Sequence, residues 1–497
     1  MERSAGVILH PSALPSTYGI GNFGAHAYQF VDFLNNSGFK HWQMCPLGPT
    51  SYGDSPYQSF SAFAGNPYFI DWDFLVEQKL VNTSDLSVLK QLSNERVEFG
   101  KLFKHFWDIF DLAFNNYKNN SSCDLKEEFE LFIKANASWL IDYSNFRALK
   151  ELFQNRSRVE WPTEFTLKKN EKGHNFSHIH SECAEKHAFS QFLFERQFSK
   201  LKQYAKEKHV QIIGDLPIFV SLDSSDVWSN PHLFDLNEQG EPNTVAGVPP
   251  DYFSENGQLW GNPLYNWKTH RKDSFNWWVA RIKHNLRLYD YVRIDHFRGF
   301  ESCWAVPSQE ATAINGTWEK APGAELFKVL KAKLKDLPII AEDLGIITEE
   351  VEQLMNETGF PGMAVLHFAF GGSSNNPYLP HMHKKHQVVY TGTHDNNTSI
   401  AWFDSLDPQT KTHVQQYLQI SGSHIGWDLI RSAFRSVADI AITPLQDLMS
   451  LGASARFNNP GTSTGNWDWR FTQSDLEVLK KDSQAYLLET LRLYGRT

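Results

Sequence analysis

Cysteine is scarce in this 497-residue chain, which contains only Cys45, Cys123, Cys183 and Cys303. These four are scattered without metal-type pair spacing, and so few thiols in so long a chain cannot form a disulfide framework. The N-terminus also lacks the positive segment followed by an apolar segment that a secretory signal requires. We therefore expect reduced thiols, no metal site and a cytoplasmic location.

Long apolar runs and basic runs are also missing. No uninterrupted apolar stretch approaches the roughly 20 residues needed to cross a bilayer, so no membrane span is expected. The chain has 47 Lys and Arg against 57 Asp and Glu, and its formal net charge is −10. This charge argues against a nucleic-acid partner or an anionic membrane surface and favours a neutral or cationic partner.

Aromatic residues, in contrast, are abundant: 16 Trp, 17 Tyr and 37 Phe. Most aromatic rings fill cores, but rings in loops beside Gly, Asn and Pro offer a flat face to the C–H surface of a sugar. Two such stretches stand out. We interpret residues 50–71 as a binding loop and residues 245–267 as a lid-like loop, with an ordinary long connection as the alternative for the second.

Apolar strand-like segments alternate with helical ones along most of the chain. Four of these segments end at an acid, namely 209–215, 291–295, 338–343 and 387–395, and further strands are expected at 363–370 and 439–444. Acids at the carboxyl ends of parallel strands lie where the active sites of barrel enzymes are found. We predict a single (β/α)8 TIM barrel over residues 1–497, with a doubly wound sheet as the alternative.

Two segments depart from this alternation. Residues 72–207 carry Leu, Phe, Glu and Lys at helical spacing and are predicted to form a helical subdomain inserted in the barrel. Residues 6–24 are rich in Gly, Pro and Ser, and we expect them to be a loop that leads into the fold.

Three of the strand-end acids provide what sugar transfer requires: Asp295, Glu342 and Asp395. One carboxylate acts as the nucleophile and a second protonates the leaving oxygen. A third can hold sugar hydroxyls and keep the acid protonated by like-charge repulsion. An isolated Asp after a strand is more often a helix cap or ion-pair partner, which is how we interpret Asp343.

The residues around these acids form recognisable motifs: GDLPI at 214–218, RIDHFRG at 293–299, AEDLG at 341–345, GTHDN at 392–396, GDSPYQSF at 53–60 and WGNPLY at 260–265. With them the chain resembles the amylomaltases, the 4-α-glucanotransferases of the wider α-amylase clan, over nearly its whole length. The resemblance implies that Asp295 is the nucleophile, Glu342 the general acid and base, and Asp395 the residue that stabilises the transition state.

The resemblance also implies a set of substrate-binding residues. His394 and Arg293 would be hydrogen-bond and charge partners of the acids, and Asp215 matches the clan's earlier acidic strand end. Tyr57 would stack on the donor sugar, and the others expected to contact the glucan are Asp251, Trp260 and Asn466. We expect His296 and Arg298 to support Asp295, and we interpret Trp467 and Trp469 as packing residues.

Three positions depart from the family pattern. Ala364 and His367 stand where Lys and Gln are expected, and Thr317 stands in place of Arg. We expect these residues to lie beside the site and to tune chain length or acceptor preference.

The implied activity is that of a retaining 4-α-glucanotransferase acting on maltooligosaccharides and α-1,4-glucans. It requires no cofactor and no metal. The alternatives are a retaining α-1,4-glucan hydrolase and a glucan-binding protein that has lost activity, although the intact trio of acids disfavours the latter. The sequence carries no indication of the oligomeric state.

Overall fold

Eight parallel strands surround a common axis in chain order in the computed structural model, which describes residues 1–120, 122–168, 179, 181–250, 254–462 and 464–497. The strands are β1 (Ser4–Ile8), β2 (His41–Gln43), β3 (Gln211–Pro217), β6 (Tyr291–Asp295), β9 (Ile339–Ala341), β10 (Gly362–Val365), β11 (Gln387–Tyr390) and β12 (Ile440–Pro444). The sheet closes where the backbone N–H of Ala341 donates to the carbonyl of Pro361, 2.9 Å away. The predicted (β/α)8 barrel is therefore confirmed, and the doubly wound alternative is wrong.

Side chains alternate along β6 between two environments: the layer between the strands and the surrounding helices, and the interior of the barrel. Val292 and Ile294 pack outward against the helices. Tyr291 packs with the apolar residues inside the barrel, and Arg293 contacts Met363 of β10. Because side chains two residues apart share a face, Asp295 follows Tyr291 and Arg293 at the carboxyl end of the interior.

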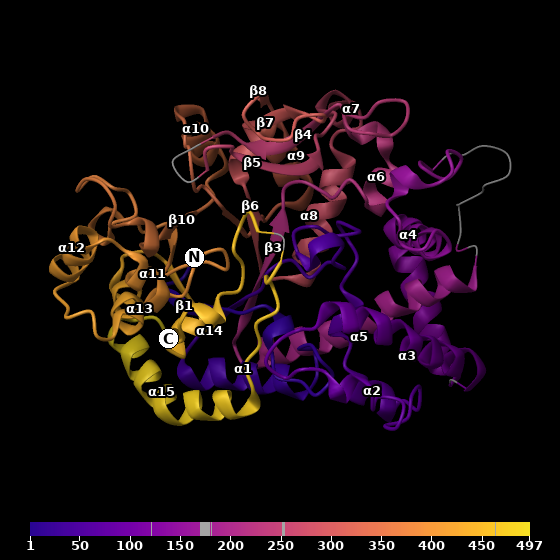
Figure 1. The fold of residues 1–497 in the computed structure, drawn as a ribbon, viewed down its shortest axis with the longest axis horizontal. Helices are drawn as coiled ribbons and strands as arrows, with labels where there is room; N and C mark the ends of the chain where they lie inside the picture. The colour runs from indigo at the N-terminus through magenta and orange to yellow at the C-terminus, as the bar shows by residue number, and fades with distance from the viewer. Residues whose placement is uncertain (121, 169–178, 180, 251–253, 463) are drawn as a thin grey trace.

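Helices surround the strands, as Figure 1 shows. Helices that pack closely on the barrel strands include α1 (Ala25–Ser37), α5 (Glu182–Glu207), α8 (Asn276–Leu288), α13 (Ile425–Arg435) and α14 (Leu445–Leu448). Packed beside them are α9 (Gly323–Leu334), α10 (Glu349–Thr358), α11 (Ser399–Ser405) and α15 (Gln473–Leu493), and shorter or peripheral helices are α6 (Ser225–Ser229), α7 (Trp267–Lys272) and α12 (Pro408–Leu418). None of the helices in the described residues is long and apolar enough to cross a membrane.

The expectation of a loop over residues 6–24 is wrong at its start, because Gly6 lies within β1. This strand is paired on both sides, with β2 and with β12. A Cβ at Gly6 would lie 2.6 Å from the Cβ of His41 and 2.7 Å from the Cδ1 of Ile442, so only glycine allows this approach. Gly6, one of the small residues that made the segment look like a loop, is thus the residue that lets the strand pack against its neighbours.

The segment 72–207 contains α2 (Trp72–Glu77), α3 (Phe99–Asn120), α4 (Cys123–Leu152) and the whole of α5. These helices lie to the right of the barrel in Figure 1. Serine side chains cap the N-terminal ends of α4 and α5: the Ser122 hydroxyl accepts from the N–H of Leu125, and the Ser181 hydroxyl accepts from the N–H of Ala184. Helix α5 packs on α4 and also on α1 and β3, so it joins the helical group to the barrel.

A small antiparallel sheet lies at the top of Figure 1. It consists of β4 (Thr244–Val248), β5 (Gln258–Pro263), β7 (Ser302–Pro307) and β8 (Thr317–Lys320), in the order β5-β4-β7-β8. The segment 245–267, expected to be a lid-like loop, thus contains two paired strands. Residues 251–253 between them, which include Asp251, lie outside the described residues.

Candidate active site

A cleft of about 1550 Å³ opens at the carboxyl ends of the barrel strands. Its walls include the antiparallel sheet, the loops that follow β2, β9, β10 and β11, and residues near the C-terminus such as Asn458 and Trp467. Pockets for small ligands usually enclose about 300–1,000 Å³, so this cleft has room for several sugar rings. It is lined by eight of the residues selected from the sequence: Tyr57, Trp260, Arg293, Asp295, Glu342, His394, Asp395 and Asn466.

Asp295 lies at the end of β6 with its carboxylate partly exposed to the cleft. Below it, the buried guanidinium of Arg293 reaches the Asp295 Oδ1 at 3.1 Å and the Asp215 Oδ2 at 2.6 Å. Burial raises the pKa of Asp295, and the positive charge of Arg293 opposes that increase. Asp215 therefore belongs to the site as a buried partner beneath the cleft, and Arg293 favours the ionised form of Asp295.

Glu342 follows β9 and is clasped by two backbone groups. The N–H of His296 donates to its Oε2 at 2.6 Å, and the N–H of Leu344 donates to its Oε1 at 3.0 Å. His296 adopts a left-handed conformation with φ of 51°, which turns the chain after Asp295 toward Glu342. Burial, followed by the negative charge of Asp295, raises the pKa of Glu342. Glu342 is thus the carboxyl group that retains its proton at higher pH.

Asp395 lies in the loop after β11 and, unlike Glu342, is held in its ionised form. Burial raises its pKa, but the neighbouring His394 and hydrogen bonds outweigh this effect and lower the pKa to about 2. The Nε2 of His394 is 3.3 Å from its Oδ2, and the amide of Asn458 donates to its Oδ1 at 2.6 Å. Asp395 is therefore an ionised carboxylate on the same cleft as Glu342, the carboxyl group that favours its proton.

Sequence reasoning missed the contacts from the segment that follows α14. Arg456 donates to the backbone carbonyl of Asp395 at 2.9 Å, and Asn458 holds its carboxylate. These residues are about 60 positions from Asp395 in the chain, so no local pattern connects them. The available signal was an Arg-Phe-Asn-Asn-Pro-Gly loop, which combines hydrogen-bonding side chains with residues typical of turns.

Aromatic rings pack closely at one end of the cleft. The hydroxyl of Tyr57 donates to Asp215 at 2.7 Å, and its ring stacks on His394 with centroids 5.1 Å apart. Trp467 packs against both rings, at 5.8 and 5.9 Å, and lines the cleft. Trp467 therefore packs, as predicted, and also forms part of the wall, whereas Trp469 is buried away from the cleft.

Trp260, Arg298 and Asn466, which were expected to contact the glucan or support Asp295, each make a specific contact. Trp260 packs edge-to-face against His296 with centroids 4.8 Å apart. The guanidinium of Arg298 lies 3.9 Å from the ring centroid of Trp318, another residue of the cleft wall. The side chain of Asn466 accepts from the N–H of Asn459 at 2.8 Å, which shapes the loop beside Asp395.

The three departures from the family pattern lie in different environments. His367 lines the cleft, where its ring stacks on Trp402 at 4.6 Å and its Nε2 is 3.0 Å from the Ser399 hydroxyl. Ala364 instead packs outward against the helices, because the alternation along β10 directs Met363 and Val365 inward. Thr317 is exposed on β8 and does not line the cleft. The expected position beside the site is thus correct only for His367.

Loss of the Asn458 contact should weaken catalysis without unfolding the protein. Asn458→Ala removes one donor to Asp395 while the His394 contact remains, so we expect kcat/KM to fall about 10-fold, the equivalent of ~1.4 kcal/mol. Steady-state transfer assays on both proteins measure the effect. Asn315→Ala, at an exposed position outside the cleft, is the control, and equal rates for Asn458→Ala and the parent would contradict the role of Asn458.

The fold and the site define a (β/α)8-barrel enzyme with three carboxyl groups on a cleft of oligosaccharide size. Residues 9–475 match the model of the 4-alpha-glucanotransferase family. The 4-alpha-glucanotransferase of Clostridium butyricum is 47% identical over 98% of this chain and 100% of its own length. That of Thermus thermophilus is 44% identical over 96% of each chain.

Among solved structures, the amylomaltase from Streptococcus agalactiae in complex with acarbose aligns with a TM-score of 0.95 at 40% identity, over 100% of both chains. The chain belongs to the 4-alpha-glucanotransferase family, and the resemblance inferred from its motifs is confirmed. It is an enzyme with 4-alpha-glucanotransferase activity, and the hydrolase alternative is not favoured.

Proposed function

We propose that the enzyme cuts an α-1,4-linked maltooligosaccharide or glucan and transfers the glucosyl segment to the 4-hydroxyl of an acceptor glucan or glucose. The reaction proceeds by double displacement with retention. The observation that carries this proposal is the pairing of Asp295, stabilised as a carboxylate by Arg293, with Glu342, whose pKa is raised. The size of the cleft and the acarbose complex of the S. agalactiae relative support an oligosaccharide substrate.

In the first half-reaction, Asp295 attacks the anomeric carbon while Glu342 gives its proton to the glycosidic oxygen. The bond to the leaving sugar breaks, and a glucosyl ester forms on Asp295. Because the ester has no charge, it no longer raises the pKa of Glu342 by repulsion. Glu342 is then a carboxylate able to act as a base.

In the second half-reaction, Glu342 takes the proton from the 4-hydroxyl of the acceptor, whose oxygen attacks the anomeric carbon. The ester bond breaks and Asp295 returns to its carboxylate form, while Glu342 regains its proton. Asp395 holds sugar hydroxyls and stabilises the positive charge of the transition state, and His394 orients it. Inversion at each step gives net retention.

The remaining predicted residues bind the glucan or shape its surroundings. Tyr57 and Trp260 offer aromatic surface to the sugars, and Asn466 and Asp251 are proposed to contact sugar hydroxyls. Strands β4 and β5 form a wall of the cleft that contains Asp295 and Glu342, and we propose that this wall limits water access to the intermediate. The four free cysteines are compatible with the proposed cytoplasmic location.

Maltotriose distinguishes transfer from hydrolysis directly. We expect glucose together with a ladder of longer maltooligosaccharides, while the number of reducing ends stays constant, because each cut bond is replaced by another. Chromatography of the products and a reducing-end assay measure both quantities. Reducing ends that rise steadily without a ladder would contradict the proposal.

A further inference from the structure

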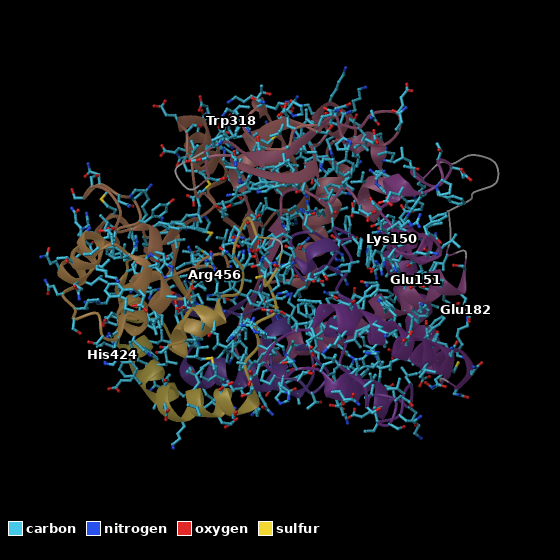
Figure 2. The ribbon with its side chains drawn as sticks, in the orientation of Figure 1. Lys150, Glu151, Glu182, Trp318, His424 and Arg456 are labelled. Carbon is cyan, nitrogen blue, oxygen red and sulfur yellow. The ribbon has the colours of Figure 1, made fainter. Side chains whose placement is uncertain are left out.

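A cluster of three metal-ligand side chains lies between α4 and α5, away from the cleft. Glu151 is on α4, whereas Cys183 and His187 are four residues apart on α5 and so share one face of that helix. Figure 2 shows Glu151 far to the right of Arg456, the residue that contacts Asp395. The proposed reaction uses none of these three residues.

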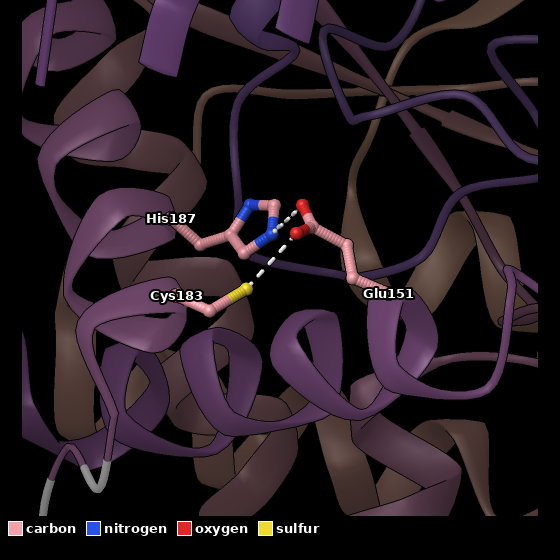
Figure 3. Close-up of side chains that lie close together, drawn as sticks. All are labelled: Glu151, Cys183 and His187. Carbon is pink, nitrogen blue, oxygen red and sulfur yellow. Dashed lines mark hydrogen bonds and ion pairs between the residues drawn. The ribbon is translucent and has the colours of Figure 1, made fainter. Parts of the chain in front are cut away.

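The ligand atoms of the cluster converge. The Nε2 of His187 is 2.8 Å from the Glu151 Oε1, and the Cys183 Sγ is 3.0 Å from the Oε2. Figure 3 shows the three side chains directed toward one another across the space between the two helices. One potential ligand atom from each residue lies within 4.8 Å of the other two.

These separations are close to those of a tetrahedral zinc site. Zn–ligand bonds of about 2.0–2.3 Å at tetrahedral angles separate ligand atoms by roughly 3.3–3.8 Å. The ligand atoms would therefore shift relative to one another by about 1 Å or less to bind the ion. An imidazole, a thiolate and a carboxylate with one water is a ligand set suited to Zn²⁺ rather than to Ca²⁺ or Mg²⁺, which prefer oxygen.

Two groups of the cluster and its surroundings are compatible with metal binding: the His187 Nδ1 and the Lys186 ammonium. Within the described residues, the buried Nδ1 of His187 has no hydrogen-bond partner, so a proton can be placed there without breaking a bond while Nε2 binds the metal. Lys186 is 3.2 Å from the Glu151 Oε2 but also 2.8 Å from the Asp111 Oδ1. It keeps the Asp111 partner if the metal takes the Glu151 oxygen.

We propose that Glu151, Cys183 and His187 form a Zn²⁺ site that links α4 to α5. On binding, the Cys183 thiol releases one proton to solvent and its thiolate binds the ion, while the His187 Nε2 and a Glu151 oxygen complete the protein ligands. Trp107 of α3, whose ring packs edge-to-face on His187 at 4.9 Å, covers one side. The spacing of the cysteines gave no indication of this site, because its ligands are of three residue types and come from two helices.

Co²⁺, used as a spectroscopic substitute for Zn²⁺, tests the site in the full-length enzyme after treatment with a chelator. We expect one equivalent of Co²⁺ to give a thiolate-to-cobalt charge-transfer band, which one equivalent of Zn²⁺ then removes. Cys183→Ser should abolish the band and weaken Zn²⁺ binding at least ~10-fold. Glu151→Gln should also weaken it, and Cys123→Ser, which removes an exposed thiol near the start of α4, should not.

Retained transfer activity in each variant shows that it is folded, so a lost band reports on the site itself. The triple replacement His174→Ala, His178→Ala and His180→Ala tests whether the histidines that precede α5 in the sequence bind the ion instead. Absence of the band in the parent enzyme, its persistence in Cys183→Ser, or its loss in the triple variant would each overturn the proposal. None of these outcomes depends on the proposed catalytic roles.

Discussion

Asp295→Ala should abolish transfer, with a fall in kcat of about 10⁴- to 10⁶-fold, as removal of a nucleophile typically causes. The reason is geometric. Asp295 stands at the end of β6 with its carboxylate open to the cleft, and the buried Arg293 favours its ionised form. No other carboxylate replaces it, because Glu342 retains its proton and Asp395 is held by His394 and Asn458.

Release of glucose from maltotriose measures this loss. Asp482→Ala, which removes an exposed carboxylate on α15, is the matched control and should retain full activity. Circular dichroism of Asp295→Ala should match that of the parent, because the removed carboxylate is at the cleft and not in the core. Disproportionation at more than about 1% of the parental rate would contradict the assignment of Asp295 as the nucleophile.

Glu342→Gln should reduce transfer from maltotriose by about 10²- to 10⁴-fold, the usual contribution of a general acid. A donor with a good leaving group, such as an α-glucosyl fluoride, does not need that proton. Its first turnover, measured as fluoride release, should therefore be much less affected. Equal loss on both donors would contradict the acid role, and Glu352→Gln, at an exposed position on α10, is the control.

The activity of the parent enzyme should depend on pH through the protonation of Glu342 and Asp295. The raised pKa of Glu342 keeps the acid protonated above the ordinary Glu value of about 4.3, and activity is lost as the pH rises through the raised value. Asp395, with its pKa of about 2, stays ionised throughout. The acidic limb instead reports protonation of Asp295, and in Glu342→Gln the basic limb should disappear for the fluoride donor.

Local sequence patterns were sufficient to predict a strand and its acid where the two are adjacent in the sequence. The run Tyr291–Asp295 carries both the alternation that fills the core and the carboxylate that reaches the cleft, so its position and its partner Arg293 could be predicted together. The barrel followed from the repetition of such strand ends. The family resemblance then supplied the roles of Glu342 and Asp395, which spacing alone does not distinguish.

Features that depend on distant contacts could not be predicted in this way. β1 is stabilised by two neighbouring strands that come from opposite ends of the chain, and its Ser-Ala-Gly-Val-Ile sequence has no strong strand pattern. The Asn458 contact with Asp395 spans 63 positions. Strands β4 and β5 were hidden by their Gly and Pro content, and β4 is ordered by pairing with β7 about 60 residues later.

The covalent intermediate tests the proposed mechanism most directly. Glu342→Gln lacks the base for the second half-reaction, so the glucosyl ester should accumulate when this variant is supplied with α-glucosyl fluoride. After acid quenching and proteolysis, mass spectrometry should find one glucosyl unit on the peptide that contains Asp295. A glucosyl unit on a peptide that contains Asp395 instead, or fluoride release with no labelled peptide, would contradict the assignment of Asp295 as the nucleophile.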